Sequence, residues 1–398
     1  MKRTGWLHIV FLLLAAWSAA GLGGCAAPPV AASGAPLPFA EAVVQATDAL
    51  VVQTQTQPLF LDRVGGRRSV VLDPMLDAAS GQQTIATLQL QDRVIDRMGT
   101  KYDAIEVLPF DGDSLAKARY LLTGTLTRVA PGQPQGPLRI DLALTELKSG
   151  TVVAHASSLV RDEGLDHTPL PYDRDTPVPT RDPLVEGYVR TTAAVAGQRA
   201  DPTYLARLAV APAITAANAH YNAGRYPEAL AQYSAVAGTA GGEQLRVLNG
   251  IYLSSAKLGR TAEAEQAFGK IVAYGIANRQ LGVKFLFNPN TTAFWSDGRI
   301  SGPYPMWLHQ IAKASTDAGV CMAIVGHTSH TGPVAYNEAL SLQRAVYIRQ
   351  RLVNDSTALG PRTTTSGMGF RENIIGSGTD DAVDALDRRV EFKIEGCG

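Results

Sequence analysis

The sequence predicts a multidomain protein in which an α/β sandwich, a short helical repeat and a second α/β domain follow one another. Between residues 39 and 163, apolar stretches with helical spacing alternate with short strand-like runs. Between residues 204 and 280, an Ala-rich pattern recurs after about 35 residues. Near the end of the chain, a buried-type strand leads through a polar loop into a helix. A chain of 398 residues is expected to hold two or three domains.

Residues 1–25 have the pattern of a secretion signal. Lys2 and Arg3 give a positive start, and the apolar core from Ile9 to Ala16 is too short for a membrane span. The ending Leu22-Gly23-Gly24-Cys25 resembles a bacterial lipobox. This resemblance implies cleavage before Cys25 and acylation of that cysteine by chains such as palmitate. The alternative is a short uncleaved anchor, which would also place the rest of the chain outside the cytoplasm.

The residues after the signal bear on location. Ala26 follows the cysteine. By resemblance to lipoprotein sorting, Ala26 rather than Asp implies the outer membrane, with the protein facing the periplasm. Residues 26–38 are rich in Ala, Pro and Gly and predict a flexible tether. We expect no transmembrane helix later in the chain.

Residues 39–163 are predicted to form the α/β sandwich, because helices alternate with strands and the segment ends in a hairpin. Ile85, Leu88, Ile95 and Met98 are expected on one face of a helix. The other expected elements are a helix over 39–52, strands over 69–72 and 104–108, a short helix over 115–118, and strands over 120–129, 138–147 and 151–160.

Two stretches of this domain, Leu122–Thr127 and Leu144–Val153, are similar to the domain shared by the lipoproteins CsgG, LpoB and FlgO. That resemblance implies work through protein contacts rather than catalysis. No nucleophile elbow, phosphate loop or metal-ligand cluster stands out in this stretch of the sequence, so we expect no enzyme and no cofactor. Four acids lie beside turn residues and are interpreted as turn chemistry rather than catalytic groups: Asp73, Asp77, Asp111 and Asp113.

Residues 164–203 are interpreted as a linker, because 164–183 is dense in Pro and Asp. In residues 204–280, a pattern around Gly224 is repeated around Gly259 and resembles tetratricopeptide repeats, which implies two pairs of antiparallel helices. Two pairs are fewer than the roughly three repeats needed for independent stability, so this segment should lean on a neighbouring domain. A protein-docking groove and a rigid spacer both remain open.

Residues 281–398 contain the strand Cys321–Val325, a polar loop and a helix over 333–353. A strand, a polar loop and a helix N-terminus form a natural anion site. On the helix, the spacing predicts a buried apolar stripe beside a polar edge. The stripe is Ala339, Leu342, Ala345, Ile348 and Leu352, and the edge is Asn337, Ser341 and Arg344.

The loop Gly326–Gly332, then Asn337, Leu340-Ser341, Arg344-Ala345 and Asp387-Arg388-Arg389-Val390, resemble the ordered motifs of the OmpA-like peptidoglycan-binding family. The resemblance implies a βαβαββ domain that binds diaminopimelate of the peptidoglycan stem peptide. A loop Asp would hold the ammonium, and Arg344 would hold the carboxylate. Ser329 stands where the family has Asp, which would weaken binding by roughly 1.5–3 kcal/mol. The predicted binding residues are Ser329, Asn337, Arg344, Arg388 and Arg389.

The cysteines after Cys25 are Cys321 and Cys397. In the OmpA-like fold their strands lie side by side and antiparallel, which implies a disulfide between them in an oxidising periplasm. Two separate buried thiols are the alternative. His327 and His330 raise a metal or catalytic interpretation, against which a loop-bracing hydrogen bond of His327 is favoured.

Composition excludes one class of partner and leaves two functions open. The net charge is zero and 18% of residues are charged, which argues against a nucleic-acid binder. We expect an outer-membrane lipoprotein that tethers the membrane to peptidoglycan or scaffolds an envelope assembly, with protein partners at the repeats or the first domain. The alternative is a protein-interaction adaptor that no longer binds peptidoglycan. A hydrolase that uses His327 or His330 is a third hypothesis.

Overall fold

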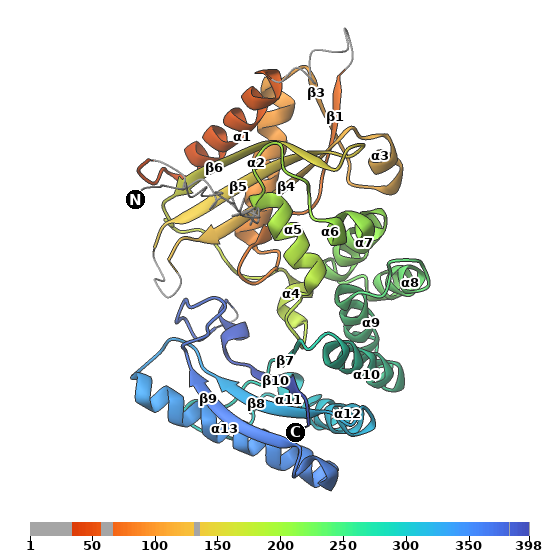
Figure 1. Cartoon of the computed structure of the whole chain (residues 1–398), viewed down its shortest axis with the longest axis vertical. Coiled ribbons are helices and arrows are strands. Elements are labelled where there is room, and N and C mark those ends of the chain that lie inside the picture. The colour runs from red at the N-terminus through yellow and green to blue at the C-terminus, as the bar shows by residue number, and fades with distance from the viewer. Residues whose placement is uncertain (1–33, 57–66, 131–135, 382, 398) are drawn as a thin grey trace, which may run out of the picture.

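The computed structural model describes residues 34–56, 67–130, 136–381 and 383–397. The predicted signal and Cys25 lie outside these residues. Figure 1 shows an α/β domain at one end, a second at the other, and a set of helices beside them. Among the described helices, none combines the length and apolar character that a membrane crossing requires.

The N-terminal domain contains a six-stranded sheet in the order β3-β1-β4-β5-β6, with β2 paired to β4. The strand β1 runs parallel to β3 and β4, whereas β4, β5 and β6 are antiparallel. The strands are β1 (Arg68–Leu72), β2 (Leu76–Asp77), β3 (Ile105–Leu108), β4 (Tyr120–Arg128), β5 (Leu138–Glu146) and β6 (Thr151–Val160). The five predicted strands are thus observed within one residue of their expected ends, and β2 is additional.

Helices cover both faces of this sheet, which confirms the α/β sandwich (Figure 1). The helices α1 (Phe39–Thr56) and α2 (Ile85–Lys101) pack on one face, and α3 (Gly112–Lys117) contacts β1. Thr84 begins α2 through a reciprocal capping box with Thr87. The buried stripe of α2 differs from the predicted one: Leu90, Val94 and Met98 are buried, while Leu88 is exposed.

Three of the four acids interpreted as turn residues act as such or lie at a helix start. Asp77 accepts hydrogen bonds from Ser80, Asp111 caps α3, and Asp113 lies in its first turn. Asp73 does not fit that interpretation. Its carboxyl is buried and accepts a hydrogen bond from the Tyr204 hydroxyl at 2.6 Å.

The predicted linker, residues 164–203, is folded and packed rather than extended. It contains α4 (Pro171–Asp175) and α5 (Pro183–Ala193), and α5 packs on the sheet face opposite α1. Tyr172 of α4 is buried, and its hydroxyl donates to the Arg246 carbonyl at 2.5 Å. The Asp and Pro residues that suggested a linker are helix-start signals here, because Asp182 caps α5 and Pro183 is its first residue.

Five helices follow, and four of them form two antiparallel hairpins. Gly224 and Gly259 make the turns inside the hairpins with φ values of +73° and +70°, a region that glycine enters without steric cost. Close packing between α8 and α9 also requires Gly250, where an added Cβ would lie 2.3 Å from the Tyr233 ring. The helices are α6 (Pro202–Arg207), α7 (Ala211–Asn222), α8 (Tyr226–Ala237), α9 (Leu245–Lys257) and α10 (Thr261–Ala277), with a 3-10 turn at Leu208–Val210.

The hairpins and the C-terminal domain share one hydrophobic core, so the helical segment does lean on its neighbour. The helix α10 packs on α12, where the rings of Phe268 and Trp307 stack with centroids 5.3 Å apart. The Trp307 indole donates to the Tyr252 hydroxyl at 2.8 Å. Tyr172 of α4 belongs to the same core, which ties the N-terminal domain to it.

The C-terminal domain has the predicted βαβαββ order. Its sheet runs β7-β10-β8-β9, with β8 antiparallel to β10 and parallel to β9. The elements are β7 (Leu281–Val283), α11 (Gly298–Ser301), α12 (Tyr304–Asp317), β8 (Cys321–His327), α13 (Val334–Asp355), β9 (Thr363–Gly369) and β10 (Val390–Glu395), with 3-10 turns at Thr357–Leu359 and Ala385–Asp387.

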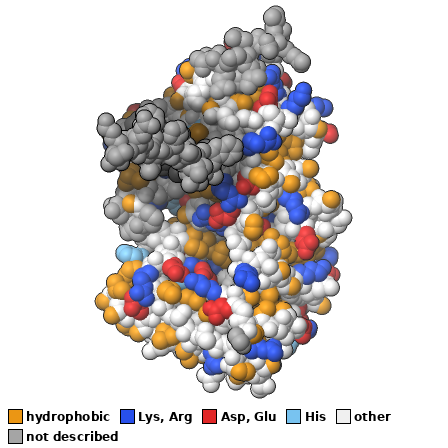
Figure 2. Space-filling model, in the orientation of Figure 1, with side chains coloured by type: hydrophobic (Ala, Val, Ile, Leu, Met, Phe, Trp, Pro, Cys, Tyr) orange, Lys and Arg blue, Asp and Glu red, His pale blue; other side chains and the backbone are white. Residues whose placement is uncertain are grey.

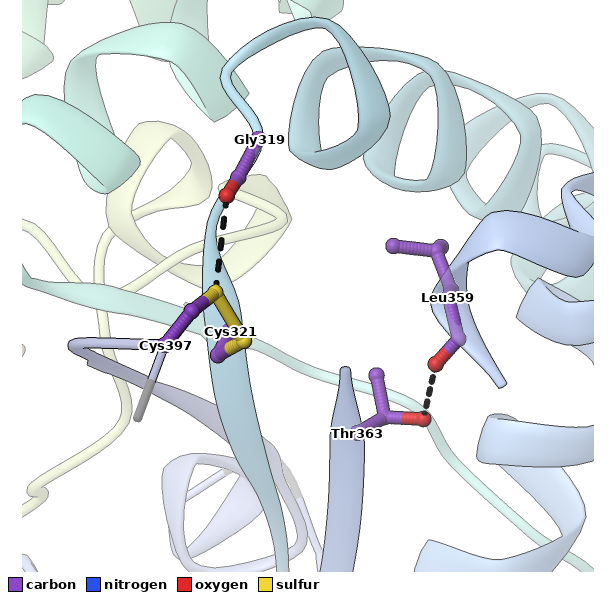
Figure 3. The surroundings of a disulfide bond; sticks show 5 residues. All are labelled: Gly319, Cys321, Leu359, Thr363 and Cys397. Atoms are coloured by element: carbon purple, nitrogen blue, oxygen red, sulfur yellow. Dashed lines mark hydrogen bonds between the residues drawn. A yellow bond between two sulfur atoms is a disulfide. The ribbon is translucent and has the colours of Figure 1, made fainter. Parts of the chain in front are cut away.

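The disulfide between Cys321 and Cys397 is present, with the two Cα atoms 5.2 Å apart (Figure 3). The bond joins the start of β8 to Cys397, which lies just after the end of β10. The antiparallel pairing of Glu395 with Cys321 brings these two chain segments together. The bond closes a separation of 76 residues and so links most of the C-terminal domain.

Candidate functional site

The polar edge of α13 lies in the interior, where strands approach the helix backbone directly. An added Cβ on Gly326 of β8 would lie 2.1 Å from the Ser341 carbonyl oxygen, and one on Gly367 of β9 would lie 2.4 Å from the Leu342 nitrogen. Ser341 accepts a hydrogen bond from the Gly369 N–H at 2.9 Å. Glycine at these positions therefore lets polar side chains of α13 sit against the loop that follows β8.

The C-terminal part of the predicted apolar stripe of α13 is confirmed, and its N-terminal part is wrong. Ala345, Ile348 and Leu352 are fully buried as predicted. Ala339 and Leu342 are exposed, and Leu340 is buried in their place. The stripe shifts because the glycine contacts turn the Ser341 side of the helix toward the sheet.

Arg344 is held at the edge of this interior by three contacts. Its Nε donates to the Thr291 carbonyl at 3.2 Å, its Nη2 donates to the Asn288 carbonyl at 3.4 Å, and its guanidinium lies 4.8 Å from the centre of the Phe287 ring. Within the described residues, Nη1 makes no hydrogen bond, and this atom is not fully buried. One side of the guanidinium fork is therefore available to a ligand.

Burial and the nearby positive charge of Arg388 lower the pKa of Arg344 to about 10, whereas Asp380 acts in the opposite direction. Even so, Arg344 is charged at neutral pH. The three residues are thus within electrostatic reach of one another. A charge in such a setting gains more from a bound anion than an exposed one, because surrounding protein replaces screening water.

Asn337 shapes the loop rather than facing outward. Its Nδ2 donates to the Thr331 carbonyl at 2.6 Å and to the Pro333 carbonyl at 3.2 Å. The residue is buried. Asn337 therefore positions the loop against the first turn of α13.

Ser329 meets an acid that sequence reasoning missed. Its hydroxyl donates to one carboxylate oxygen of Asp380, and the Thr331 hydroxyl donates to the other at 2.6 Å. Asp380 lies in the loop between β9 and β10 and has a φ of +56°. A Gly, Ser and Thr-rich loop with two adjacent acids was the available signal in the sequence, but nothing there placed it beside residue 329.

The two predicted arginines near the end of the chain have different places. Arg388 contacts Asp384 at 2.7 Å and Asp380 at 3.4 Å, so it belongs to the site. Arg389 is 4% exposed, pairs with Glu391 at 2.6 Å and donates to the Glu372 carbonyl at 3.0 Å. Arg389 therefore belongs to the support of β10 and lies apart from the Asp380 group.

His327 is buried, and its Nε2 lies 3.6 Å from Glu391. The predicted bracing hydrogen bond is absent among the described residues, where neither ring nitrogen has a hydrogen-bond partner. Burial raises the pKa of Glu391, but His327 and Arg389 outweigh it and lower the pKa to about 2. His327, Glu372 and Glu391 place their ligand atoms within 4.8 Å of one another. Lys393 and Arg389 already neutralise the two carboxylates, so a metal cation would meet two positive charges.

Comparison with known proteins identifies this domain. Residues 304–385 match the model of the OmpA family. Outer membrane porin F of Pseudomonas fluorescens is 40% identical over 72 residues, which are 18% of this chain and 22% of that protein. The chain therefore spans about a fifth of the length of this relative.

Solved structures give weaker likenesses. The peptidoglycan-associated lipoprotein of Burkholderia pseudomallei is 24% identical, covers 29% of this chain and 89% of its own, and has a TM-score of 0.23. The periplasmic domain of Helicobacter pylori MotB is 19% identical, with 29% and 73% covered and a TM-score of 0.24. On the family match, residues 304–385 of this chain, from α12 to the turn before β10, form an OmpA family domain.

Proposed function

We propose that this protein binds peptidoglycan non-covalently through its OmpA family domain and is held at the outer membrane by lipid on Cys25. The observation that carries wall binding is the match to the OmpA family over residues 304–385, which include Ser329 and Arg344. The anchoring claim rests on the lipobox-like sequence at Cys25, which lies outside the described residues. The outer-membrane location of the porin F relative supports it.

Arg344 binds a carboxylate of the stem peptide. The two backbone carbonyls and the Phe287 ring hold the guanidinium in place, so little rotamer entropy is lost on binding. The open Nη1 side donates to the ligand, and the positive charge of Arg388 adds attraction. On the face shown in Figure 2, acidic and basic side chains are interspersed, so recognition depends on these placed groups rather than on a surface of one sign.

Membrane anchoring raises the effective concentration of the domain at the wall, so a modest affinity for peptidoglycan is enough to keep it bound. A lipid on Cys25 would confine the domain to the layer next to the wall, which makes rebinding an intramolecular event. The hairpins and the OmpA family domain share a core and so form a single body, which supports the spacer interpretation of the helices. The N-terminal domain would then be held at a fixed offset from the wall.

The first test is sedimentation with purified peptidoglycan. We expect Arg344→Ala to weaken binding about tenfold to a hundredfold, because a charge-assisted hydrogen bond is lost. Arg351→Ala is the matched control, since Arg351 lies two turns further along α13 and is exposed. Equal recovery of wild type and Arg344→Ala would contradict the proposal, provided both melt at similar temperatures.

The second test concerns the anchor. The mature protein should carry acyl chains on Cys25, and Cys25→Ser should appear in the soluble periplasmic fraction. Mass spectrometry of the N-terminal peptide measures this directly. A mature N-terminus that is unacylated, or that begins at another residue, would contradict the proposed anchoring and would leave the proposal of wall binding unaffected.

One observation favours the adaptor as a second candidate function. An open groove of about 510 Å³ lies along the hairpins, lined by α8, α9 and α10. Leu230, Leu248 and Ile251 give it an apolar floor, and Arg260, Glu263 and Lys270 line its rim. If wild type fails to sediment with peptidoglycan while crosslinks in intact envelopes map to this groove, the adaptor becomes the better description.

A further inference from the structure

The loop between β9 and β10, residues 370–389, brings an acid to the place that residue 329 occupies in the OmpA-like pattern. Asp380 accepts hydrogen bonds from the hydroxyls of Ser329 and Thr331, one on each carboxylate oxygen. An aspartate at 329 would face Asp380 at contact distance, and two carboxylates that close repel. The hydroxyl of Ser329 therefore suits its position, because it donates a hydrogen bond to Asp380 where a second carboxylate would be repelled.

The loop that delivers Asp380 is fastened at both ends. Asp387 accepts hydrogen bonds from the N–H groups of Ile374, Ile375 and Gly376 at 2.7–3.0 Å. An added Cβ on Gly378 would lie 3.0 Å from the His330 carbonyl oxygen, so the loop crosses the polar loop at close range. Asp387 thus ties the end of this loop to its beginning, and Ser329 contacts the loop at Asp380.

The backbone at Asp380 is held in an unusual conformation. Its φ is +56°, and its N–H donates to Asp384 at 3.0 Å. Asp384 is fully buried and pairs with Arg388. Left-handed conformations of non-glycine residues persist where the surroundings enforce them, and they gather at functional sites. The buried pair below thus sets the direction of the Asp380 side chain.

Asp380 is ionised and reachable. Burial raises its pKa, but hydrogen bonds from Ser329 and Thr331 and the charge of Arg388 outweigh burial and hold the pKa below its usual range. Its side chain is 48% exposed. A carboxylate offers about four acceptor sites, of which the two hydroxyls take two, and the 3.4 Å contact to Arg388 is long. Acceptor capacity therefore remains for a ligand.

We propose that Asp380 is the ammonium-binding residue of this domain, and that with Arg344 it forms a clamp for a zwitterionic amino-acid group with ammonium and carboxylate on one carbon. This inference rests on the proposed function, and it assigns the acidic half of the site to a residue from another loop. The ammonium is received by Asp380 at the Ser329 loop, and the carboxylate by the open side of Arg344. Arg388 stays paired with Asp384 while the ligand displaces its longer contact to Asp380.

The test separates the two halves of the clamp with two soluble probes, measured by isothermal titration on the full chain. Diaminopimelate carries the zwitterionic group, and pimelate is the same diacid without amino groups. We expect Asp380→Asn to weaken diaminopimelate binding about tenfold to a hundredfold and to leave pimelate unchanged, because the amide keeps the acceptor for Ser329 but loses the charge. Arg344→Ala should weaken both probes. Asp381→Asn, an exposed neighbouring acid, is the matched control.

A charge relocation provides the second variant. Ser329→Asp alone should weaken diaminopimelate binding, because it places two acids together, and Ser329→Asp with Asp380→Asn should restore it. Wild-type affinity for diaminopimelate in Asp380→Asn, with Arg344→Ala still defective, would overturn the assignment of Asp380 while keeping the proposed function. Loss of both probes in Asp380→Asn without rescue by the double variant would assign Asp380 a folding role instead. Failure of wild type to bind either probe or peptidoglycan would overturn both.

Discussion

At the residue scale, the site depends on which of several similar side chains the fold exposes. Arg388 and Arg389 are adjacent, yet the first contacts Asp380 and the second is locked against Glu391 under β10. Arg388 caps the 3-10 turn Ala385–Asp387, whereas Arg389 leads directly into β10, so the two side chains have different surroundings. The contribution of Ser329 likewise depends on its partner, because its hydroxyl holds the carboxylate of Asp380 through a hydrogen bond.

At the scale of elements, the contact between β8 and α13 sets the site. Gly326 lets the strand approach the helix so closely that the Ser341 carbonyl would lie 2.1 Å from an added Cβ. That approach buries Asn337 and Ser341 and brings Arg344 beside the 287–291 segment. The positions of Asn337, Ser341 and Arg344 therefore depend on the strand, the helix and the loop together.

This contact gives a prediction about stability. Gly326→Ala should lower the free energy of unfolding by about 2–4 kcal/mol, because backbone must shift to admit the methyl group. Gly99→Ala is the matched control, since Gly99 lies within α2 with open space around its Cβ position and should gain about 0.5–1 kcal/mol. Urea unfolding of the three proteins measures both changes. An unchanged midpoint for Gly326→Ala would show that the helix is not seated as described.

At the scale of the whole molecule, the N-terminal domain meets the hairpins around a buried polar cavity of about 30 Å³. Asp73 and Asp173 line it together with Arg246, whose Nε has no hydrogen-bond partner among the described residues. Burial raises the pKa of Asp73 to about 6 and that of Asp173 to about 7. Burial also lowers the pKa of Lys284, which interacts electrostatically with Asp173, to about 8.

The raised values make this junction sensitive to pH. At pH values between 3.8, the unfolded pKa, and the folded pKa values of about 6 and 7, the folded state binds more protons than the unfolded state. The contribution of Asp73 and Asp173 to the free energy of unfolding is therefore largest at low pH and is lost as pH rises through 6–7. Asp173→Asn should therefore gain about 2–3 kcal/mol over wild type at pH 8 and little at pH 4. Urea unfolding at both pH values measures it, with exposed Asp113→Asn as control. A gain that is equal at both pH values would contradict the assignment.

Much of the fold followed from local pattern. Hydrophobic periodicity located five strands of the first sheet and the α13 helix, because side chains at a spacing of two or of three to four residues must share a face. The order of elements in the C-terminal domain came from the family resemblance. The binding roles proposed for Arg344 and Arg388 came from the ordered spacing of the family pattern. The segment 164–203 was misjudged, since Asp and Pro serve equally in linkers and at helix starts.

The sequence by itself determined the family of the C-terminal domain and pointed to Arg344, because the family pattern depends on residue types at fixed spacing along one strand, loop and helix. Only the tertiary structure decided that Asp380 stands beside Ser329 and that Asp73 and Asp173 are buried at one junction. Those pairings join residues that lie far apart in the chain. Local propensity carries no information about such contacts, because packing of the whole chain selects them.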